Sequence, residues 1–371
     1  MCRFRKIWVC SLLALLLALL LPAGAGAMAA KPANDAEPAN AATAAATPGA
    51  AAAYVMELHS GETIFSQNGE QMLPPASTGK IVTALLTLDM AEDLDERTTI
   101  SAQAAAVPEM SIDLRAGETL TLADLLTGAL VHSGNDACFA LAEAVAGSEP
   151  LFVHWLNLKA AVLGAYATQL YNPHGLPEEG HAMSAADLAH LAAYAMQHPF
   201  FAETVASKQA VFGEGESRRS YTNTNKLLWQ DAHIIGIKTG TTDDAGNCLV
   251  AAYADQAAVY LSVVFHSPDR YGESMALLNY GMEEMACVDF VKRGEICAYV
   301  PVSGVEGEYL PLVAANDGCF LYPQGKQLYM RRLLPQTVES DTPAGSGLGR
   351  LIIEDQDGQI YGWVDLTLKD F

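Results

Sequence analysis

Basic residues are scarce in this chain of 371 residues. It contains 21 lysines and arginines against 43 aspartates and glutamates, which gives a formal net charge of −22. Binding to nucleic acid requires clustered lysine and arginine side chains that face the phosphates, so we do not expect a nucleic-acid partner. Charged residues make up only 17% and hydrophobic residues 51% of the chain, which indicates a globular protein with a sizeable core.

Metal-binding patterns are also missing. The chain has no Cys-x-x-Cys pair, and none of its nine histidines belongs to a His-Glu-x-x-His sequence, which argues against a zinc peptidase. Of the seven cysteines, five lie beyond the N-terminal apolar segment, and an odd number at wide spacing does not indicate a disulfide framework. A bridge between Cys297 and Cys319 is compatible with the sequence, which alone does not decide it. We therefore expect no metal ion and no cofactor.

An apolar run over residues 7–21 follows a short basic segment at the N-terminus. The run is shorter than the roughly 20 residues that a membrane-spanning helix needs, and small residues follow it. We predict a cleaved export signal over residues 1–27, with an uncleaved membrane anchor as the alternative. Residues 28–51 are rich in alanine and proline and are predicted to form a disordered linker.

The remaining sequence combines strand and helix patterns. Two short strands flank the turn "HSGE". Helical segments follow, and one of them begins with a capping pair of Thr121 and Asp124. Strands return at "IIGIKTG", "NCLVAAYA" and "AVYLSVVFH". We predict an α+β domain over residues 52–285, in which strands from both of its ends form one antiparallel sheet flanked by helices. A small all-β domain is predicted over residues 286–371, where short strands alternate with turns.

The stretch "PPASTGK" places Ser77 three residues before Lys80, at the start of an apolar helix. Residues i and i+3 share one helix face, so a buried lysine would lie beside the serine hydroxyl and could take its proton. A free lysine has a pKa of about 10.4, so a neutral Lys80 near pH 7 needs a shift of about 3 units. Burial and a nearby cation can cause such a shift, which predicts a second lysine in the site. Alternatively, Ser77 is an ordinary helix cap and Lys80 a surface residue.

Two further stretches carry candidate site residues. The stretch "SGN" lies in the break between two helical segments. Ser133 could shuttle a proton there and Asn135 could hold a peptide bond. Alternatively, both residues simply cap the next helix. In "KTG", at the end of a strand, Lys238 could be the second cation and Thr239 could hold a carboxylate. Gly240 would let a substrate backbone lie close to the strand. The simpler explanation of "KTG" is a strand end with turn residues.

The order Ser-x-x-Lys, Ser-x-Asn, Lys-Thr-Gly is the pattern of the penicillin-recognising serine enzymes. From about residue 52 onward, the chain resembles the D-alanyl-D-alanine carboxypeptidases. These are low-molecular-weight penicillin-binding proteins of serine peptidase family S11. The resemblance rests on this motif order and on the stretches "LRAGETLTLADLL", "YTNTNKLLW" and "GIKTGTTDDAGNCLVAAY". The resemblance implies a DD-peptidase/β-lactamase-like fold for the larger domain and the family's small C-terminal domain for the rest.

The resemblance also implies catalytic roles. Ser77 would attack the carbonyl between the two terminal D-alanines of a peptidoglycan stem peptide, with Lys80 as the base. Ser133 would pass a proton to the leaving D-alanine. Asn135 would hold the substrate amide, and Lys238 would tune the two neighbouring catalytic groups electrostatically. β-Lactam antibiotics would be covalent inhibitors.

Roles in substrate binding follow in the same way. Thr239 would bind the terminal carboxylate with help from Arg270, and the backbone N–H groups of Ser77 and Thr241 would form the oxyanion hole. Thr241 departs from the family pattern, in which tyrosine or histidine is common at this position. The lone His174 in "NPHGL" is interpreted as structural rather than catalytic.

Other classes share part of this pattern. A class A-like β-lactamase usually needs a Glu-x-x-Leu-Asn pentapeptide, which is missing here. A DD-endopeptidase that cuts crosslinked peptides and a non-catalytic wall-binding protein are further alternatives. We expect an enzyme outside the cytoplasmic membrane that is soluble and has no stable membrane anchor, since the last residues, "GQIYGWVDLTLKDF", alternate like a strand and not like an amphipathic helix.

Overall fold

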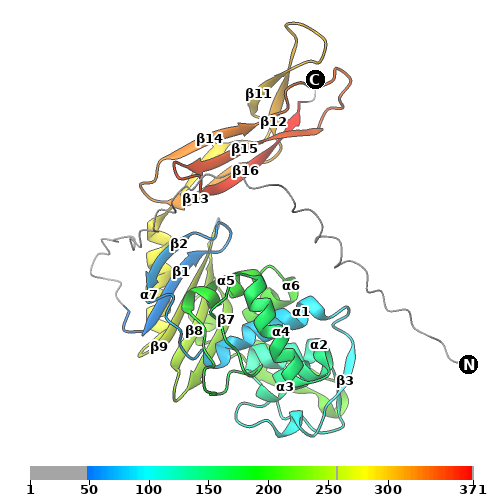
Figure 1. Cartoon of the computed structure of the whole chain (residues 1–371), viewed down its shortest axis with the longest axis vertical. Coiled ribbons are helices and arrows are strands. Elements are labelled where there is room, and N and C mark those ends of the chain that lie inside the picture. The colour runs from blue at the N-terminus through cyan, green and yellow to red at the C-terminus, as the bar shows by residue number, and fades with distance from the viewer. Residues whose placement is uncertain (1–47, 256–257, 370–371) are drawn as a thin grey trace, which may run out of the picture. The chain divides into compact units, whose positions relative to one another are not determined.

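The structure is a computed structural model that describes residues 48–255 and 258–369 (Figure 1). The predicted export signal and all but the last residues of the predicted linker lie outside this part of the chain. Among the residues that are described, no helix is both long and apolar enough to cross a membrane.

The central sheet has five strands in the order β2-β1-β9-β8-β7. They are β1 (Ala52–Glu57), β2 (Thr63–Gln67), β7 (Ile234–Thr242), β8 (Gly246–Ala254) and β9 (Val259–Ser267). All neighbouring strands are antiparallel. The pairing of β1 with β9 confirms that one sheet is built from both ends of this region, with the helices inserted between them.

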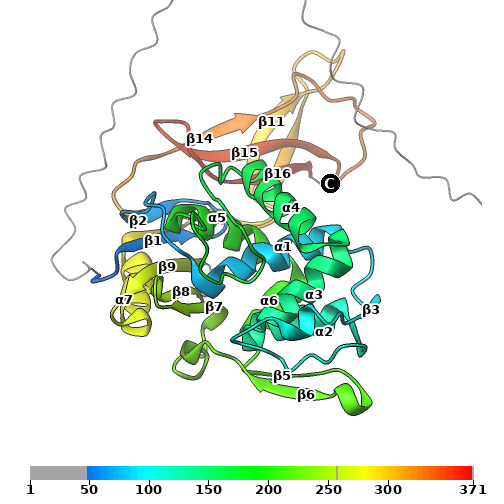
Figure 2. The same ribbon diagram turned by 60° about the horizontal axis from the view of Figure 1, so that its bottom comes forward.

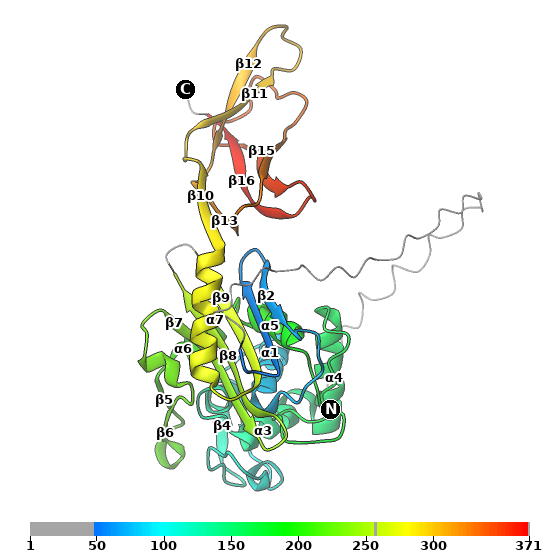
Figure 3. The same cartoon turned by 90° about the vertical axis from the view of Figure 1, so that its left-hand side faces the viewer.

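Helices α5 (Ala185–Ala195) and α7 (Arg270–Glu284) pack against strands of this sheet, and α1 (Lys80–Met90) packs against α5. Alternate side chains of a strand point to opposite faces, so the sheet has two separate apolar faces. Leu249 of β8 packs in one core with Leu277 of α7, whereas its neighbour Val250 belongs to the core that contains α1 and α5. Figure 3 shows α7 on one side of the sheet and α1 and α5 on the other.

The remaining helices form a group beside the sheet, with short hairpins around it (Figure 2). The α-helices are α2 (Leu122–Thr127), α3 (Asn135–Ala146), α4 (Glu149–Val162) and α6 (Pro199–Ala206). The hairpins are β3 (Arg97–Thr99) with β4 (Thr119–Thr121) and β5 (Gln209–Phe212) with β6 (Arg219–Thr222). Thr121 and Asp124 form the predicted capping box at the start of α2.

Short helices connect these elements. The 3₁₀ helices are η1 (Ala76–Gly79), η2 (Ala104–Ala106), η4 (Gly215–Ser217) and η5 (Lys226–Trp229). The element η3 (Gly128–His132) is a single π-helical turn that continues α2. Such turns occur frequently at functional sites, because they redirect the chain that follows.

In the described part of the chain after α7, which ends at residue 369, all the regular elements are strands. They are β10 (Met285–Val291), β11 (Ile296–Pro301), β12 (Tyr309–Ala314), β13 (Gly318–Pro323), β14 (Leu328–Leu333), β15 (Gly347–Asp355) and β16 (Ile360–Leu368). β10 pairs with β13, and the others form a sheet in the order β11-β12-β16-β15-β14. This region has its own apolar core, which includes Val300, Leu312 and Val364. The all-β character is therefore as predicted, whereas the boundary at residue 286 stays a prediction.

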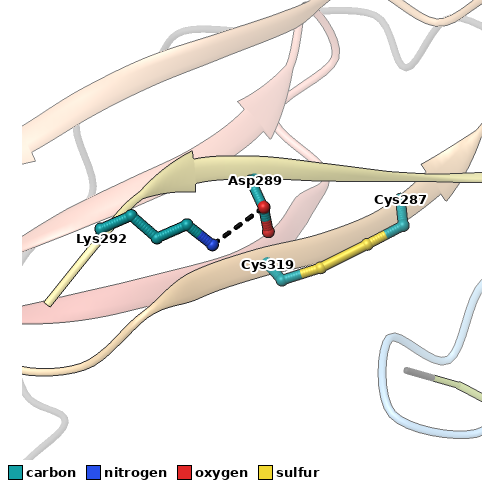
Figure 4. The surroundings of a disulfide bond; sticks show 4 residues. All are labelled: Cys287, Asp289, Lys292 and Cys319. Atoms are coloured by element: carbon teal, nitrogen blue, oxygen red, sulfur yellow. Dashed lines mark hydrogen bonds and ion pairs between the residues drawn. A yellow bond between two sulfur atoms is a disulfide. The ribbon is translucent and has the colours of Figure 1, made fainter. Parts of the chain in front are cut away.

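A disulfide bond joins the two strands of the smaller sheet. Cys319 of β13 is bonded to Cys287 of β10 (Figure 4), and their Cα atoms lie 6.6 Å apart. Whether Cys297 pairs with Cys319 was left open by the sequence; the structure pairs Cys319 with Cys287, and Cys297 is a free thiol. The physical reason is the strand pairing: β10 is the neighbour of β13, whereas Cys297 lies on β11, at the edge of the other sheet.

Candidate active site

Ser77 lies in η1, immediately before α1, and not within the α-helix itself. The turn is held by Thr78, whose backbone N–H and hydroxyl both donate to the carbonyl of Pro75, at 3.2 and 2.5 Å. Ala76 has a left-handed backbone with φ of 49°. Ala76 and Thr78 are buried, whereas Ser77 between them is half-buried, so the Ser77 hydroxyl stays accessible. Lys80 is the first residue of α1 and lies one turn further on, as predicted.

Lys80 is fully buried and its amine has three oxygen neighbours. The Nζ atom lies 2.7 Å from Oγ of Ser77, 2.7 Å from Oδ1 of Asn135 and 2.6 Å from the carbonyl oxygen of His174. An ammonium group can donate to all three. A neutral amine can donate to Asn135 and His174 while its lone pair accepts the hydroxyl hydrogen of Ser77. The geometry therefore suits a base for the serine.

The two lysines of the site are both poorly solvated. Burial lowers the pKa of Lys80 to about 8, although the negative charges of Glu109 and Asp136 oppose the shift. Burial, followed by the positive charge of Lys80, holds the pKa of Lys238 well below its ordinary value. The shift has the direction that the sequence predicted, and its main cause is loss of water rather than the second cation.

Ser133 and Asn135 lie where η3 ends and α3 begins. Ser133 has a left-handed backbone, with φ of 72°, and its buried hydroxyl has no hydrogen-bond partner among the described residues. Asn135 accepts from Lys80 through Oδ1, and its Nδ2 donates to the carbonyl of Pro108 at 2.9 Å. Neither side chain caps α3, whose N-cap is Gly134, so the simpler capping explanation does not apply.

The Lys-Thr-Gly sequence lies on β7, which is an edge strand of the central sheet. A Cβ atom added to Gly240 would lie 3.0 Å from the backbone nitrogen of Ser77, so the strand passes directly beside the nucleophile. The Thr239 hydroxyl lies 2.7 Å from that of Thr224, to which it donates. Lys238 donates to the carbonyl of Thr239 at 3.1 Å. An edge strand beside a nucleophile can accept an extended peptide as an additional strand.

Arg270, the first residue of α7, reaches the same strand. Its Nη1 atom donates to the hydroxyl of Thr241 at 2.7 Å and to the carbonyl of Gly240 at 2.9 Å. The guanidinium group also lies over the ring of Tyr271, 5.1 Å from its centroid. The structure therefore brings Arg270 together with the Lys-Thr-Gly strand, although 30 residues separate it from Gly240.

Sequence reasoning missed the part that the loop with His174 and Gly175 has in the site. Lys80 contacts the backbone carbonyl of His174, and a backbone contact leaves no signal in the residue type. The His174 ring accepts from the backbone N–H of Leu176 at 3.4 Å, and burial lowers its pKa to about 3. The ring is therefore uncharged at neutral pH, which agrees with its interpretation as structural. Gly175 was the one available sign of a close backbone contact.

These features together define a class of protein. The half-buried hydroxyl of Ser77 lies beside the buried amine of Lys80, which also contacts the amide of Asn135. A second lysine, Lys238, is buried on β7, the edge strand that passes along the site. Nucleophile, base and a platform for a peptide are what a serine enzyme needs for acyl transfer.

Comparison with known proteins identifies the family. Residues 39–269 match the model of peptidase family S11, D-alanyl-D-alanine carboxypeptidase, and the chain belongs to this family. It is therefore a serine-type D-Ala-D-Ala carboxypeptidase, a hydrolase of cell-wall peptidoglycan metabolism, and the β-lactamase and endopeptidase alternatives are not favoured.

Individual relatives cover most of the chain. It is 27% identical over 332 residues to D-alanyl-D-alanine carboxypeptidase DacF of Bacillus subtilis, a match that covers 86% of this chain and 85% of DacF. It is 32% identical over 329 residues to DacC of Escherichia coli, with coverage of 85% and 79%. Penicillin-binding protein 5 of Haemophilus influenzae has a similar structure, with a TM-score of 0.67 and 26% identity over 87% of this chain and 97% of that one. The predicted α+β DD-peptidase fold with an all-β C-terminal region is confirmed.

Proposed function

We propose that this carboxypeptidase removes the terminal D-alanine of peptidoglycan stem peptides through an acyl-enzyme on Ser77. The observation that carries the proposal is the 2.7 Å contact between the Ser77 hydroxyl and the amine of Lys80, which is fully buried. A nucleophilic serine needs a base within hydrogen-bond distance whose pKa is near the working pH. A pKa of about 8 gives Lys80 an appreciable neutral fraction at neutral pH.

Acylation begins with transfer of the Ser77 proton to neutral Lys80 while the serine oxygen attacks the carbonyl between the two D-alanines. The carbonyl becomes an oxyanion, which the backbone N–H groups of Ser77 and Thr241 stabilise by a contribution of about 3 to 4 kcal/mol. Ser133 then donates its proton to the leaving nitrogen and is reprotonated from the lysines. The C–N bond breaks, and D-alanine leaves as a neutral amine.

Deacylation reverses the roles. Lys80, neutral again, takes a proton from water as the water attacks the ester carbonyl. The bond between the Ser77 oxygen and the acyl carbon breaks, and the serine regains its proton from Lys80. The products are the shortened stem peptide and free enzyme. Because side chains and water carry every proton, the proposed cycle uses no metal ion or cofactor.

Substrate recognition uses the strand edge of β7. The peptide lies along Gly240, Asn135 holds its amide, and Thr239 and Arg270 bind the terminal carboxylate. The position of Arg270 beside Gly240 and Thr241 supports its inclusion in this group. Penicillin and other β-lactams acylate the same serine, since their strained amide reaches the same position as the scissile bond.

We also propose that the enzyme acts outside the cytoplasmic membrane, as a soluble protein after cleavage of residues 1–27. Residues 28–51 would be a linker, 52–285 the catalytic domain and 286–371 the C-terminal β domain. Fractionation of the source cells tests the location. Recovery in the membrane pellet after a high-salt wash, with the N-terminal segment still attached by mass spectrometry, would show that this segment is an anchor.

Release of D-alanine from a synthetic stem peptide tests the activity. The purified protein should release one D-alanine per peptide, and a chelator should leave the rate unchanged. Benzylpenicillin should form a long-lived complex, whereas rapid turnover of the antibiotic would support a β-lactamase. The Lys80→Ala variant is the matched inactive control.

A further inference from the structure

Ser133 has a backbone conformation that serine rarely adopts. Its φ of 72° and ψ of 29° lie in the left-handed region, which is unfavourable for residues other than glycine because of steric crowding at Cβ. Its hydroxyl has no hydrogen-bond partner among the described residues. Since no hydrogen bond from the described residues holds the hydroxyl, the backbone turn sets the direction of the Cα–Cβ bond that carries it, and any contact that holds this turn holds that direction.

The residue before it, His132, stacks on a ring of the β5–β6 hairpin. The ring centroids of His132 and Tyr221 are 4.1 Å apart, and the ring planes are inclined by 26°. A second contact comes from Thr224, two residues after β6, whose backbone N–H donates to the carbonyl of Val131 at 3.2 Å. The hairpin and the residues that follow it thus contact the last two residues of η3, directly before Ser133.

The Tyr221 ring is itself anchored to a neighbouring loop. Its hydroxyl donates to the carboxylate of Asp113 at 3.0 Å. Arg219, two residues before it on β6, donates to the carbonyl of Asp113 at 2.8 Å and forms a 2.6 Å ion pair with Glu118. Both side chains of this ion pair are only 9% exposed, so it is well shielded from solvent. The ring under His132 is therefore tied to the loop around Asp113 and Glu118.

We propose that His132 and Tyr221 are positioning residues, whose stacked rings hold the turn that directs the Ser133 hydroxyl for proton transfer to the leaving D-alanine. This inference rests on the role proposed above for Ser133. A displacement of about 1 Å of a catalytic group can cost roughly a hundredfold in rate, so a modest change in the turn has a measurable effect. Burial lowers the pKa of His132, and the charge of Lys238 acts in the same direction, while Asp113 and Asp136 oppose it. A neutral ring stacks without adding a third cation beside the two lysines.

The test compares two substrates that differ in their leaving group. One is an acylated D-Ala-D-Ala peptide, whose amine must gain a proton to leave. The other is its thioester analogue, in which a mercapto acid replaces the terminal D-alanine and the thiolate leaves without a proton. We expect His132→Ala and Tyr221→Leu to lower kcat/KM for the amide roughly 10- to 100-fold and that for the thioester by less than about threefold. His132→Phe, which keeps a ring to stack, should restore amide hydrolysis to within about threefold of the wild type.

A matched control exists elsewhere in the fold. His233 and Tyr253 form another stacked pair, with ring centroids 5.2 Å apart and planes inclined by 22°. Tyr253→Leu should leave both rates unchanged. If the His132 and Tyr221 variants lose activity equally toward the amide and the thioester, the two rings have a merely structural role and the proposal is overturned. The absence of any loss would overturn it as well.

Ser133→Ala separates this inference from the function on which it rests. If Ser133→Ala slows the amide selectively and the stacking variants do not, the positioning role alone is wrong. If Ser133→Ala slows both substrates equally, the assigned proton transfer is wrong, and the positioning proposal is overturned with it. The active-site concentration of each variant is determined by saturating labelling with penicillin, so that partial unfolding does not imitate a rate effect.

Discussion

Gly175 lies directly against the carbonyl of Ala76, the residue before the nucleophile. A Cβ atom added to Gly175 would lie 2.0 Å from that oxygen, and the glycine has φ of +84°. The loop that supplies the His174 carbonyl to Lys80 can therefore approach the nucleophile turn only because this position has no side chain. The same contact links the position of the base to that of the serine.

Gly175→Ala should therefore be more harmful than an ordinary replacement of a left-handed glycine. The backbone conformation alone costs about 1–2 kcal/mol for alanine, and the clash with Ala76 adds to this. We expect the free energy of unfolding to fall by more than about 2 kcal/mol, together with slower acylation by penicillin. Gly164→Ala is the control, because Gly164 has φ of +93° but no atom within 4 Å of an added Cβ. Equal effects of the two substitutions would contradict the packing argument.

The pH dependence of acylation should report the titration of the buried lysines. The acylating form needs neutral Lys80, so the second-order rate constant for penicillin should rise with pH and level off above an apparent pKa of about 8. Because Lys80 and Lys238 are coupled, this value belongs to the pair. Stopped-flow measurements between pH 6 and pH 10 would check it. A profile that is flat over this range would rule out Lys80 as the base.

Lys80→Arg separates the charge of Lys80 from its basicity. Arginine remains protonated at all accessible pH values and cannot accept the Ser77 proton. We expect acylation to fall by roughly 10²- to 10⁴-fold, the usual contribution of general base catalysis. The same loss should occur at pH 9. Recovery of the rate at high pH in this variant would mean that another group takes the proton.

Arg270→Ala should weaken substrate binding and leave the nucleophile intact. The substitution removes the hydrogen bonds to Thr241 and Gly240, as well as the charge near the expected carboxylate. Hydrogen bonds to charged groups are worth about 1.5–3 kcal/mol, so kcat/KM for the stem peptide should fall roughly 10- to 100-fold. Arg350→Ala is the control, since Arg350 pairs with Asp365 in the C-terminal sheet. Unchanged kinetics of Arg270→Ala would remove this residue from the site.

The disulfide bond should stabilise the C-terminal strands without affecting catalysis. Cys287 and Cys319 have a sequence separation of 32, and such bridges are worth about 2–4 kcal/mol. Cys287→Ser should lower the unfolding temperature of this region and leave acylation by penicillin unchanged. Cys297→Ser, which removes a thiol outside the disulfide, should change neither quantity. An equal loss of stability in both variants would contradict the observed pairing.

Much of the site was predictable because its chemistry depends on residue type. The spacing of Ser77 and Lys80 signals a nucleophile and base, and Lys238 was expected because a second cation helps to keep the first lysine neutral. The strand-like runs at both ends of the larger region, with helical segments between them, likewise predicted a sheet assembled from both ends, which the pairing of β1 with β9 confirms.

Other parts of the site depend on backbone geometry, which residue types do not reveal. The carbonyl of His174 serves Lys80, and any residue could supply it. The left-handed turn at Ser133 comes directly after a π-helical turn, and the ring that stacks on its neighbour His132 belongs to Tyr221, which is distant in the sequence. The partner of Cys319 depends on which strand is its neighbour, and spacing along the chain does not show this.

The covalent adduct with penicillin is the most direct test of the proposed acyl-enzyme. The protein is incubated with benzylpenicillin, digested and analysed by mass spectrometry. The account predicts that one penicilloyl group is attached to the peptide that contains Ser77, and that Ser77→Ala abolishes the adduct while the circular dichroism spectrum stays unchanged. An adduct on another residue, or full labelling of folded Ser77→Ala, would contradict it.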